Sequence, residues 1–265
     1  MNKTNRLILL GAGMLTATAI AFAFAKGMPG YRINDAASVN RAVHQYADDC
    51  DKFGAVIYQA GLDKDLWQLT IAAHAYYRSK PSDAERECSF VNAYWGLRDR
   101  NETIPPDAAK QLEGMYGEAV DDTEDVAHKL PDSMTAHLVY GRYMLLHVMG
   151  MAKVKPMLAE FRKAVMLRPD SGTAHYWLAQ GLAGSGDYSR PTADATIREA
   201  KKAIRLDPRL SESYYLLATA YELPSEDNRK MSEIYLNKYL KIHPERANIP
   251  DIAGFRKWYS EKPSH

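Results

Sequence analysis

The chain has 265 residues, of which 46% are hydrophobic and 25% are charged, a balance typical of a soluble globular protein and unlike that of a disordered one. Its 34 basic residues nearly balance its 33 acidic ones, which argues against the basic stripe expected of a nucleic-acid-binding protein. The length is sufficient for one substantial hydrophobic core or two modest ones.

The first 25 residues have the pattern of a secretory signal. Lys3 and Arg6 precede an uncharged, apolar run from Leu7 to Ala25, and Ala23-Phe24-Ala25 places small residues at the two positions that a signal peptidase reads. The run is also long enough to span a bilayer, so a retained membrane anchor is the alternative. In either case we expect residues 26–265 outside the cytoplasm, periplasmic or secreted, or anchored to the inner membrane and facing the periplasm.

Cys50 and Cys88 are the only cysteines of the chain. In an oxidising compartment an even pair is most simply a disulfide, and two separately buried thiols are the alternative. Neither cysteine lies in a Cys-x-x-Cys motif, which argues against redox catalysis. We therefore predict a Cys50–Cys88 disulfide.

Residues 26–130 are predicted to form an irregular helical region, and degenerate hairpins within it would continue the architecture that follows. Ser82-Asp83-Ala84-Glu85 has the form of a capping box, in which Ser82 and Glu85 would each satisfy a free backbone N–H group. Pro105-Pro106 marks the entry to the last helix of the region. The predicted helices are Ala36 to Tyr58, Asp65 to Arg78, Asp83 to Arg98 and Asp107 to Lys129.

A repeating unit of helix, turn, helix and proline follows. Prolines close four comparable segments at intervals of 36 to 39 residues, at Pro131, Pro169, Pro208 and Pro244. Proline fits this place because a helix cannot readily continue through it. The heptapeptides PDSMTAH and PDSGTAH, which end at His137 and His175, differ at one position only. We interpret them as one structural unit that has been copied along the chain.

These units resemble the tetratricopeptide repeat, a helical hairpin with the pattern W-x2-L-G-x2-Y … A … F … P. The best-matching unit has Tyr214, Leu217, Ala218 and Tyr221 before Pro244, and no unit has tryptophan at the first aromatic position. The resemblance implies an all-α fold, a right-handed solenoid of antiparallel helical hairpins. It implies three repeats in residues 131–246, with a C-terminal capping helix and tail in residues 247–265.

The titratable residues give only weak signals for chemistry. His137 and His175 occupy the slot that the third unit fills with Tyr214, so we expect them to pack between helices rather than to bind a metal. The acidic run EAVDDTEDV lacks the ligand spacing and the glycine of a calcium loop, and is predicted to be a solvated helix face or a helix break. We predict no catalytic residue, no metal site and no cofactor.

In the resembled family, the first helices of successive units line a concave groove whose side chains select the ligand. Carried over by register, this implies a partner-binding groove in which Tyr176 and Tyr215, in equivalent slots, would be anchors. The residues that this groove would expose are Leu138, Arg142, Leu145, Thr173, Tyr176, Gln180, Glu212, Tyr215, Thr219 and Glu222.

The predicted function is a non-enzymatic protein-interaction scaffold of the cell envelope that binds a peptide or protein segment. Nucleic acid is not an expected partner, and membrane contact is expected only if the N-terminal segment is retained. One alternative is a small-molecule or lipid carrier with a superhelical cavity. Another is an enzyme with its site in residues 32–129, near the two cysteines, for which the candidate residues are His44, His74, Glu85 and Glu87.

Overall fold

The computed structural model describes residues 36–63, 66–98, 103–148, 151–221, 226–247 and 252. The predicted signal or anchor at residues 1–25 lies outside these ranges, as does the predicted capping helix except for Ile252. Within the described ranges all regular structure is helical, as the sequence predicts. None of the helices there combines the length and the apolar character needed to cross a membrane.

The N-terminal half is helical, and two of its expected helices are each divided in two. The first is interrupted at residues 47–49, where the Asp49 carboxylate accepts the Lys52 backbone N–H at 2.9 Å and so caps the start of the next helix. The last is interrupted at Met115. The helices are α2 (Ala36–Tyr46), α3 (Cys50–Asp63), α4 (Leu66–Arg78), α5 (Ala84–Arg98), α6 (Pro106–Gly114) and α7 (Tyr116–Lys129).

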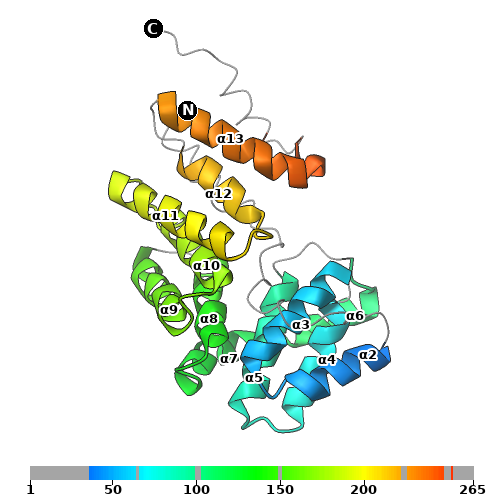
Figure 1. Cartoon of the computed structure of the whole chain (residues 1–265). Coiled ribbons are helices and arrows are strands. Elements are labelled where there is room, and N and C mark those ends of the chain that lie inside the picture. Colours follow the sequence, from blue (N-terminus) through cyan, green and yellow to red (C-terminus); the bar gives the residue numbers. More distant parts are fainter. Residues whose placement is uncertain are drawn as a thin grey trace.

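Three regular hairpins follow and stack on one another (Figure 1). Within each hairpin the two helices pack together, and each hairpin packs against the next one along the chain. This stacking confirms the predicted solenoid of helical hairpins. The pairs are α8 (Met134–Leu146) with α9 (Val154–Leu167), α10 (Gly172–Ala183) with α11 (Arg190–Leu206), and α12 (Glu212–Ala220) with α13 (Glu226–Ile242); the short 3-10 helices Met151–Lys153 and Pro244–Arg246 precede α9 and follow α13.

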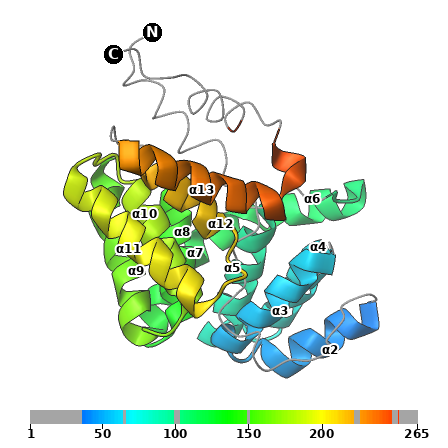
Figure 2. The ribbon, with the colours of Figure 1, turned by 45° about the horizontal axis from the view of Figure 1, so that its top comes forward.

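The N-terminal half joins this stack through a fourth, irregular hairpin. Helix α5 packs against α7, and both pack against α8, so α6 is an insertion between the two helices of that hairpin. Helices α2, α3 and α4 lie on the other side of the molecule from α9 and α11 (Figure 2). One hydrophobic core cluster runs from Val39 to Leu217, across the predicted boundary at residue 130. The division of the chain into separate domains stays a prediction.

Phe161 of α9 fixes the spacing between the first two regular hairpins. Its ring is fully buried and lies between Gly141 of α8 and Gly181 of α10. A Cβ atom at either glycine would lie 2.6 Å from a ring carbon of Phe161, closer than real contacts allow. Both glycines are therefore required for close approach of the helices, a use of small residues that the repeat pattern anticipates at Gly141.

Candidate functional site

His137 holds the first regular hairpin together through both of its ring nitrogens. Its Nδ1 atom lies 2.6 Å from Oε2 of Glu160 on α9, and its Nε2 atom lies 3.0 Å from the backbone oxygen of Pro131. We call this set of contacts a histidine clasp. The next hairpin has a second histidine clasp, with corresponding distances of 2.7 and 3.0 Å, formed by His175, Glu199 and Pro169.

The third hairpin fills the same slots with aromatic rings. Tyr214 and Tyr235 stack there with their centroids 6.4 Å apart, where the other hairpins have a histidine and a glutamate. At this position two hairpins have a histidine–glutamate contact and the third has two stacked tyrosines. This equivalence supports the expectation that the histidines pack between helices. Among the described residues, no group of three His, Cys, Asp or Glu side chains is arranged to hold a metal ion.

Sequence reasoning missed the glutamate partners of these histidines. Glu160 and Glu199 each stand nine residues before the proline that closes their unit. Their equivalence could have been found by aligning the units on those prolines. The two glutamates belong to the more charged second helices, where a single carboxylate is typical of a solvated face and so does not indicate a buried partner.

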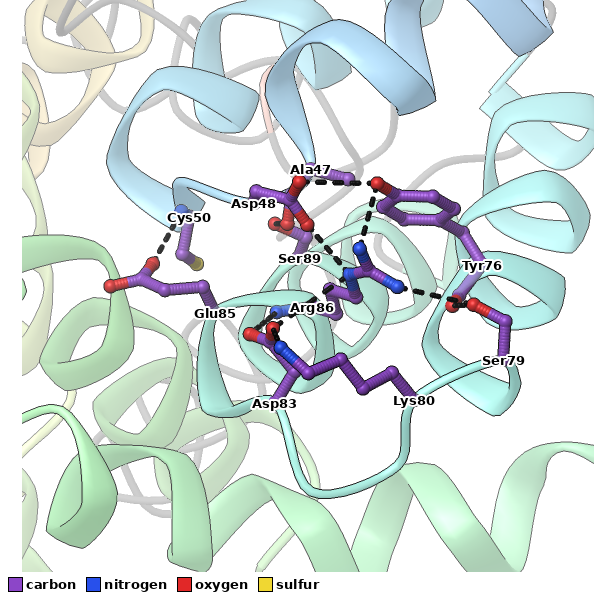
Figure 3. Close-up of polar contacts among 10 residues, drawn as sticks. All are labelled: Ala47, Asp48, Cys50, Tyr76, Ser79, Lys80, Asp83, Glu85, Arg86 and Ser89. Atoms are coloured by element: carbon purple, nitrogen blue, oxygen red, sulfur yellow. Dashed lines mark hydrogen bonds and ion pairs between the residues drawn. The ribbon is translucent and has the colours of Figure 1, made fainter.

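The predicted disulfide is present between α3 and α5. Cys50 and Cys88 are bonded, with their Cα atoms 5.6 Å apart. Beside the bond, Ser89 donates its hydroxyl to the backbone oxygen of Ala47 at 3.0 Å (Figure 3). These contacts tie α5 to the turn between α2 and α3.

The predicted capping box at Ser82 to Glu85 is wrong. Helix α5 begins at Ala84, and Asp83 is the residue whose carboxylate accepts the Arg86 backbone N–H, at 3.4 Å. Glu85 accepts instead the Cys50 backbone N–H at 2.7 Å and so caps a different helix, α3. A carboxylate at a helix N-terminus is stabilised by the helix dipole and by the free N–H groups there.

Arg86 is the centre of the polar network drawn in Figure 3. Its guanidinium group donates to Oδ1 of Asp48 at 2.6 Å, to the hydroxyl of Tyr76 at 2.9 Å and to the hydroxyl of Ser79 at 3.1 Å. It also lies 3.9 Å from the centre of the Tyr76 ring, a cation–π distance. This network joins the end of α4 to the turn after α2, and its groups are engaged with one another.

The four residues considered for an enzyme site have four separate partners. His44 packs edge-on against Tyr76, and His74 lies 2.8 Å from Glu118. Glu85 caps α3, and Glu87 accepts two hydrogen bonds from Lys129 at 2.7 and 2.8 Å. Each of these side chains therefore joins a different pair of segments.

The acidic run in α7 is divided between solvent and the protein interior. Asp121, Glu124 and Asp125 are exposed, as expected for a solvated face. Asp122 is half-buried and accepts a hydrogen bond from Tyr77, and burial raises the pKa of its carboxyl above the ordinary value. Burial likewise raises the pKa of Glu87, against the opposing hydrogen bonds from Lys129.

The implied groove residues are placed at different depths. Leu138, Arg142, Thr173 and Tyr176 are buried, so the expectation that they are exposed is wrong. Glu222 lies outside the described residues. The members that reach the surface in part are Leu145, Gln180, Glu212, Tyr215 and Thr219.

Contacts with neighbouring helices account for the burial of the first unit. Helices α3 and α5 both pack against α8. Arg142 of α8 donates to Asn92 of α5 at 3.5 Å, and its guanidinium lies 5.0 Å from the centre of the Trp177 ring on α10. Equivalent slots become more accessible along the solenoid: Tyr176 is 3% exposed, whereas Tyr215 is half-buried.

Comparisons with known proteins yield structural neighbours only. No protein-family model and no curated protein matches the chain. A crystal structure of MamA is 16% identical, with a TM-score of 0.46 over 72% of this chain and 96% of that one. A MamA RS-1 double mutant is also 16% identical, with a TM-score of 0.46 over 75% of this chain and 97% of that one. YrrB, described as a TPR protein with an unusual peptide-binding site, is 16% identical, with a TM-score of 0.45 over 84% of this chain and 100% of that one. Because the identities and TM-scores are low, we infer nothing about this chain from these neighbours. The hairpin architecture is assigned from the helices of this chain and the contacts between them.

Proposed function

We propose that this protein is a non-enzymatic scaffold that binds a peptide or protein segment on the face formed by the first helices of its hairpins. The observation that supports this most is the set of half-buried side chains Gln180, Tyr215 and Thr219, which α10 and α12 present in equivalent or neighbouring slots. An aromatic ring beside amide and hydroxyl groups is suited to binding, because the ring supplies contact area and the polar groups supply direction.

The titratable side chains of the described residues support a scaffold over an enzyme. The clasp histidines are bonded to the frame of their hairpins. In the N-terminal half, Arg86 and Glu87 are similarly engaged in contacts between helices. Groups held in this way stabilise the packing of the helices, which is the role that a scaffold requires of them.

We further propose that the protein is exported to the cell envelope. The Cys50–Cys88 disulfide supports an oxidising compartment, where such bonds persist. The apolar run at residues 7–25 supports secretion or anchoring at the inner membrane. A partner in the same compartment would be a protein or peptide of the envelope.

The test uses the full chain, carrying a C-terminal affinity tag and isolated from the envelope fraction of cells that express it. A captured protein is identified, its binding segment is synthesised as a peptide, and the Kd is measured. A Gln180→Ala, Tyr215→Ala double variant should bind the peptide at least about tenfold more weakly, since loss of a central aromatic contact typically costs over 1 kcal/mol.

A matched control is the Tyr188→Ala variant, because Tyr188 is 51% exposed and lies in the turn between α10 and α11. This variant should bind as the parent does, and thermal unfolding should show all three proteins to be folded. Equal affinity of the parent and the double variant would place binding elsewhere on the molecule. If no protein is captured but a small molecule co-purifies, the carrier alternative replaces the scaffold.

A further inference from the structure

In both histidine clasps, each ring nitrogen faces an acceptor. The Pro131 and Pro169 partners are backbone oxygens, which can only accept hydrogen bonds, and the Glu160 and Glu199 partners are carboxylates. A neutral imidazole has a single N–H group and can satisfy only one of two acceptors. Both contacts of a clasp are satisfied only when the histidine and its carboxylate together hold one additional proton.

That additional proton is held in a largely water-excluded place. His175 is 1% exposed and His137 is 7% exposed. A clasp that loses this proton has only one ring N–H group for its two acceptors, so one of its two contacts must open. We place that proton on the imidazole of His137, because its pKa is raised above the ordinary value.

The groups around His137 favour its protonated state. Around His137, burial is the largest influence and opposes the charge, but the Glu160 carboxylate and the Pro131 oxygen raise the pKa of His137 above its ordinary value. Lys163 of α9 acts in the opposite direction. In the second clasp, Glu199 is shared with Arg198, whose Nε lies 3.4 Å from the other carboxylate oxygen.

Each clasp is placed at a joint of the solenoid. Pro131 and Pro169 lie in the turns that connect one hairpin to the next, while the histidine and the glutamate belong to the two helices of the following hairpin. Closing a clasp therefore ties a joint to both helices of a hairpin, and opening it releases that joint.

We propose that the His137 clasp is a proton-dependent contact at the first joint of the solenoid, closed at mildly acidic pH and open as the pH rises through neutrality. This inference does not depend on the proposed binding function. For a group whose pKa is higher in the folded state, the stability is fully present below the pKa of the unfolded chain, near 6.5 for histidine. It is lost as the pH rises through the folded-state pKa.

The third joint, between α11 and α12, serves as an internal control for the pH effect. Its clasp slots hold Tyr214 and Tyr235 in place of histidine and glutamate. The histidine nearest to it, His243, lies 2.8 Å from the Ser211 hydroxyl, and a hydroxyl can donate or accept. A contact of this kind does not require an additional proton, so α12 should be far less sensitive to pH than α8.

The primary experiment measures hydrogen exchange and thermal unfolding of the full chain at about pH 6 and pH 8, around the histidine range. After correction for intrinsic exchange rates, the first turn of α8 should lose protection at the higher pH, while α12 should change little. The Tm should fall by roughly 3–5 °C for each unit by which folding raises the pKa of His137.

The Glu160→Gln, Glu199→Gln double variant isolates the clasps from other titrating groups. A glutamine amide can turn its NH2 group toward a neutral ring, so both contacts of each clasp form without the additional proton. The difference in Tm between the two pH values should shrink in this variant. As a matched control, replacing the exposed His128 in His128→Gln should leave the difference as in the parent.

A measurement on the unaltered protein keeps the proposal testable if the double variant does not fold. In 15N NMR spectra the two nitrogens of a doubly protonated ring resonate close together, and those of a neutral ring lie far apart. Closely spaced resonances for His137 at pH 6, which separate by pH 8, would support the proposal. A neutral His137 ring at pH 6, or an unchanged pH effect in a folded double variant, would overturn it.

Discussion

The helices before Pro131 and the hairpins after it are held together by different kinds of contact. In the N-terminal half, distant segments are joined by a disulfide, by the Arg86 network and by the ion pair of buried Glu87 with Lys129. In the regular hairpins, the joining contacts recur at equivalent positions: two histidine clasps and a phenylalanine between two glycines. A repeat can hold its neighbours by copying one solution, whereas irregular helices need a separate solution for every contact.

The largest loss of stability is expected when the Phe161 ring is removed. We expect Phe161→Ala to destabilise the protein by about 4–5 kcal/mol, in the upper part of the range for buried phenylalanines, because the ring fills the space between two hairpins. Denaturant unfolding followed by circular dichroism measures this loss. Met166→Ala, on the same helix but 75% exposed, should change stability by less than about 0.5 kcal/mol.

An equal and small effect of both substitutions would contradict the packing argument. It would mean that the hairpins are held mainly by their turns and clasps. Hydrogen exchange would then show the interior of α9 opening as readily in the parent as in the Phe161→Ala variant.

The second test concerns the disulfide of the N-terminal half. Cys50 and Cys88 are 38 residues apart, and chain-entropy estimates for a loop of this length give a stabilisation of about 3–4 kcal/mol. We expect a Cys50→Ser, Cys88→Ser variant to lose this amount. Hydrogen exchange should locate the loss in α3 and α5, leaving α10 to α13 protected as in the parent.

The contrary result would be a uniform loss of protection along the whole chain. Since one hydrophobic core cluster runs through both halves, such a result would show that they unfold as a single cooperative unit. The predicted division at residue 130 would then have no thermodynamic meaning.

The sequence predicts the regular hairpins better than the contacts of the irregular half. Four closing prolines and a copied heptapeptide locate the repeats, and two cysteines with a secretory pattern predict their pairing. The destination of Glu85 could not be predicted, because its partner, the N–H of Cys50, is brought near only by the tertiary fold. A capping box is a local pattern, and here a long-range partner replaced it.

The same limit explains the errors in the implied groove. Register correctly places Tyr176 and Tyr215 in equivalent slots, but register does not say which helices cover a slot. The burial of Arg142 depends on Asn92 of α5 and Trp177 of α10, which lie far from it in sequence. Exposure is a property of the assembled layers, so it cannot be read from one repeat.

The smallest loss of stability is expected from substitutions at the contact between the two regions, where Ser133 meets Asp51. Ser133 and Ser171 cap α8 and α10 in the same way, each accepting a backbone N–H at 3.2 Å. Ser133 also donates to Asp51 of α3 at 2.9 Å, and the same carboxylate oxygen accepts the Thr135 N–H. Ser171→Ala should cost about 1 kcal/mol, and Ser133→Ala about 0.5–1 kcal/mol more, because it removes the cap and one contact of Asp51.

A double-mutant cycle with Asp51→Ala separates these two contributions. The coupling energy between Asp51 and Ser133 should be about 0.5–1 kcal/mol, whereas that between Asp51 and Ser171 should be close to zero. Equal costs for the two serine substitutions would show that Asp51 adds nothing at Ser133. The irregular half would then be held to the first regular hairpin by apolar packing and by the Arg142–Asn92 contact, and the contrast between the two regions would narrow at their junction.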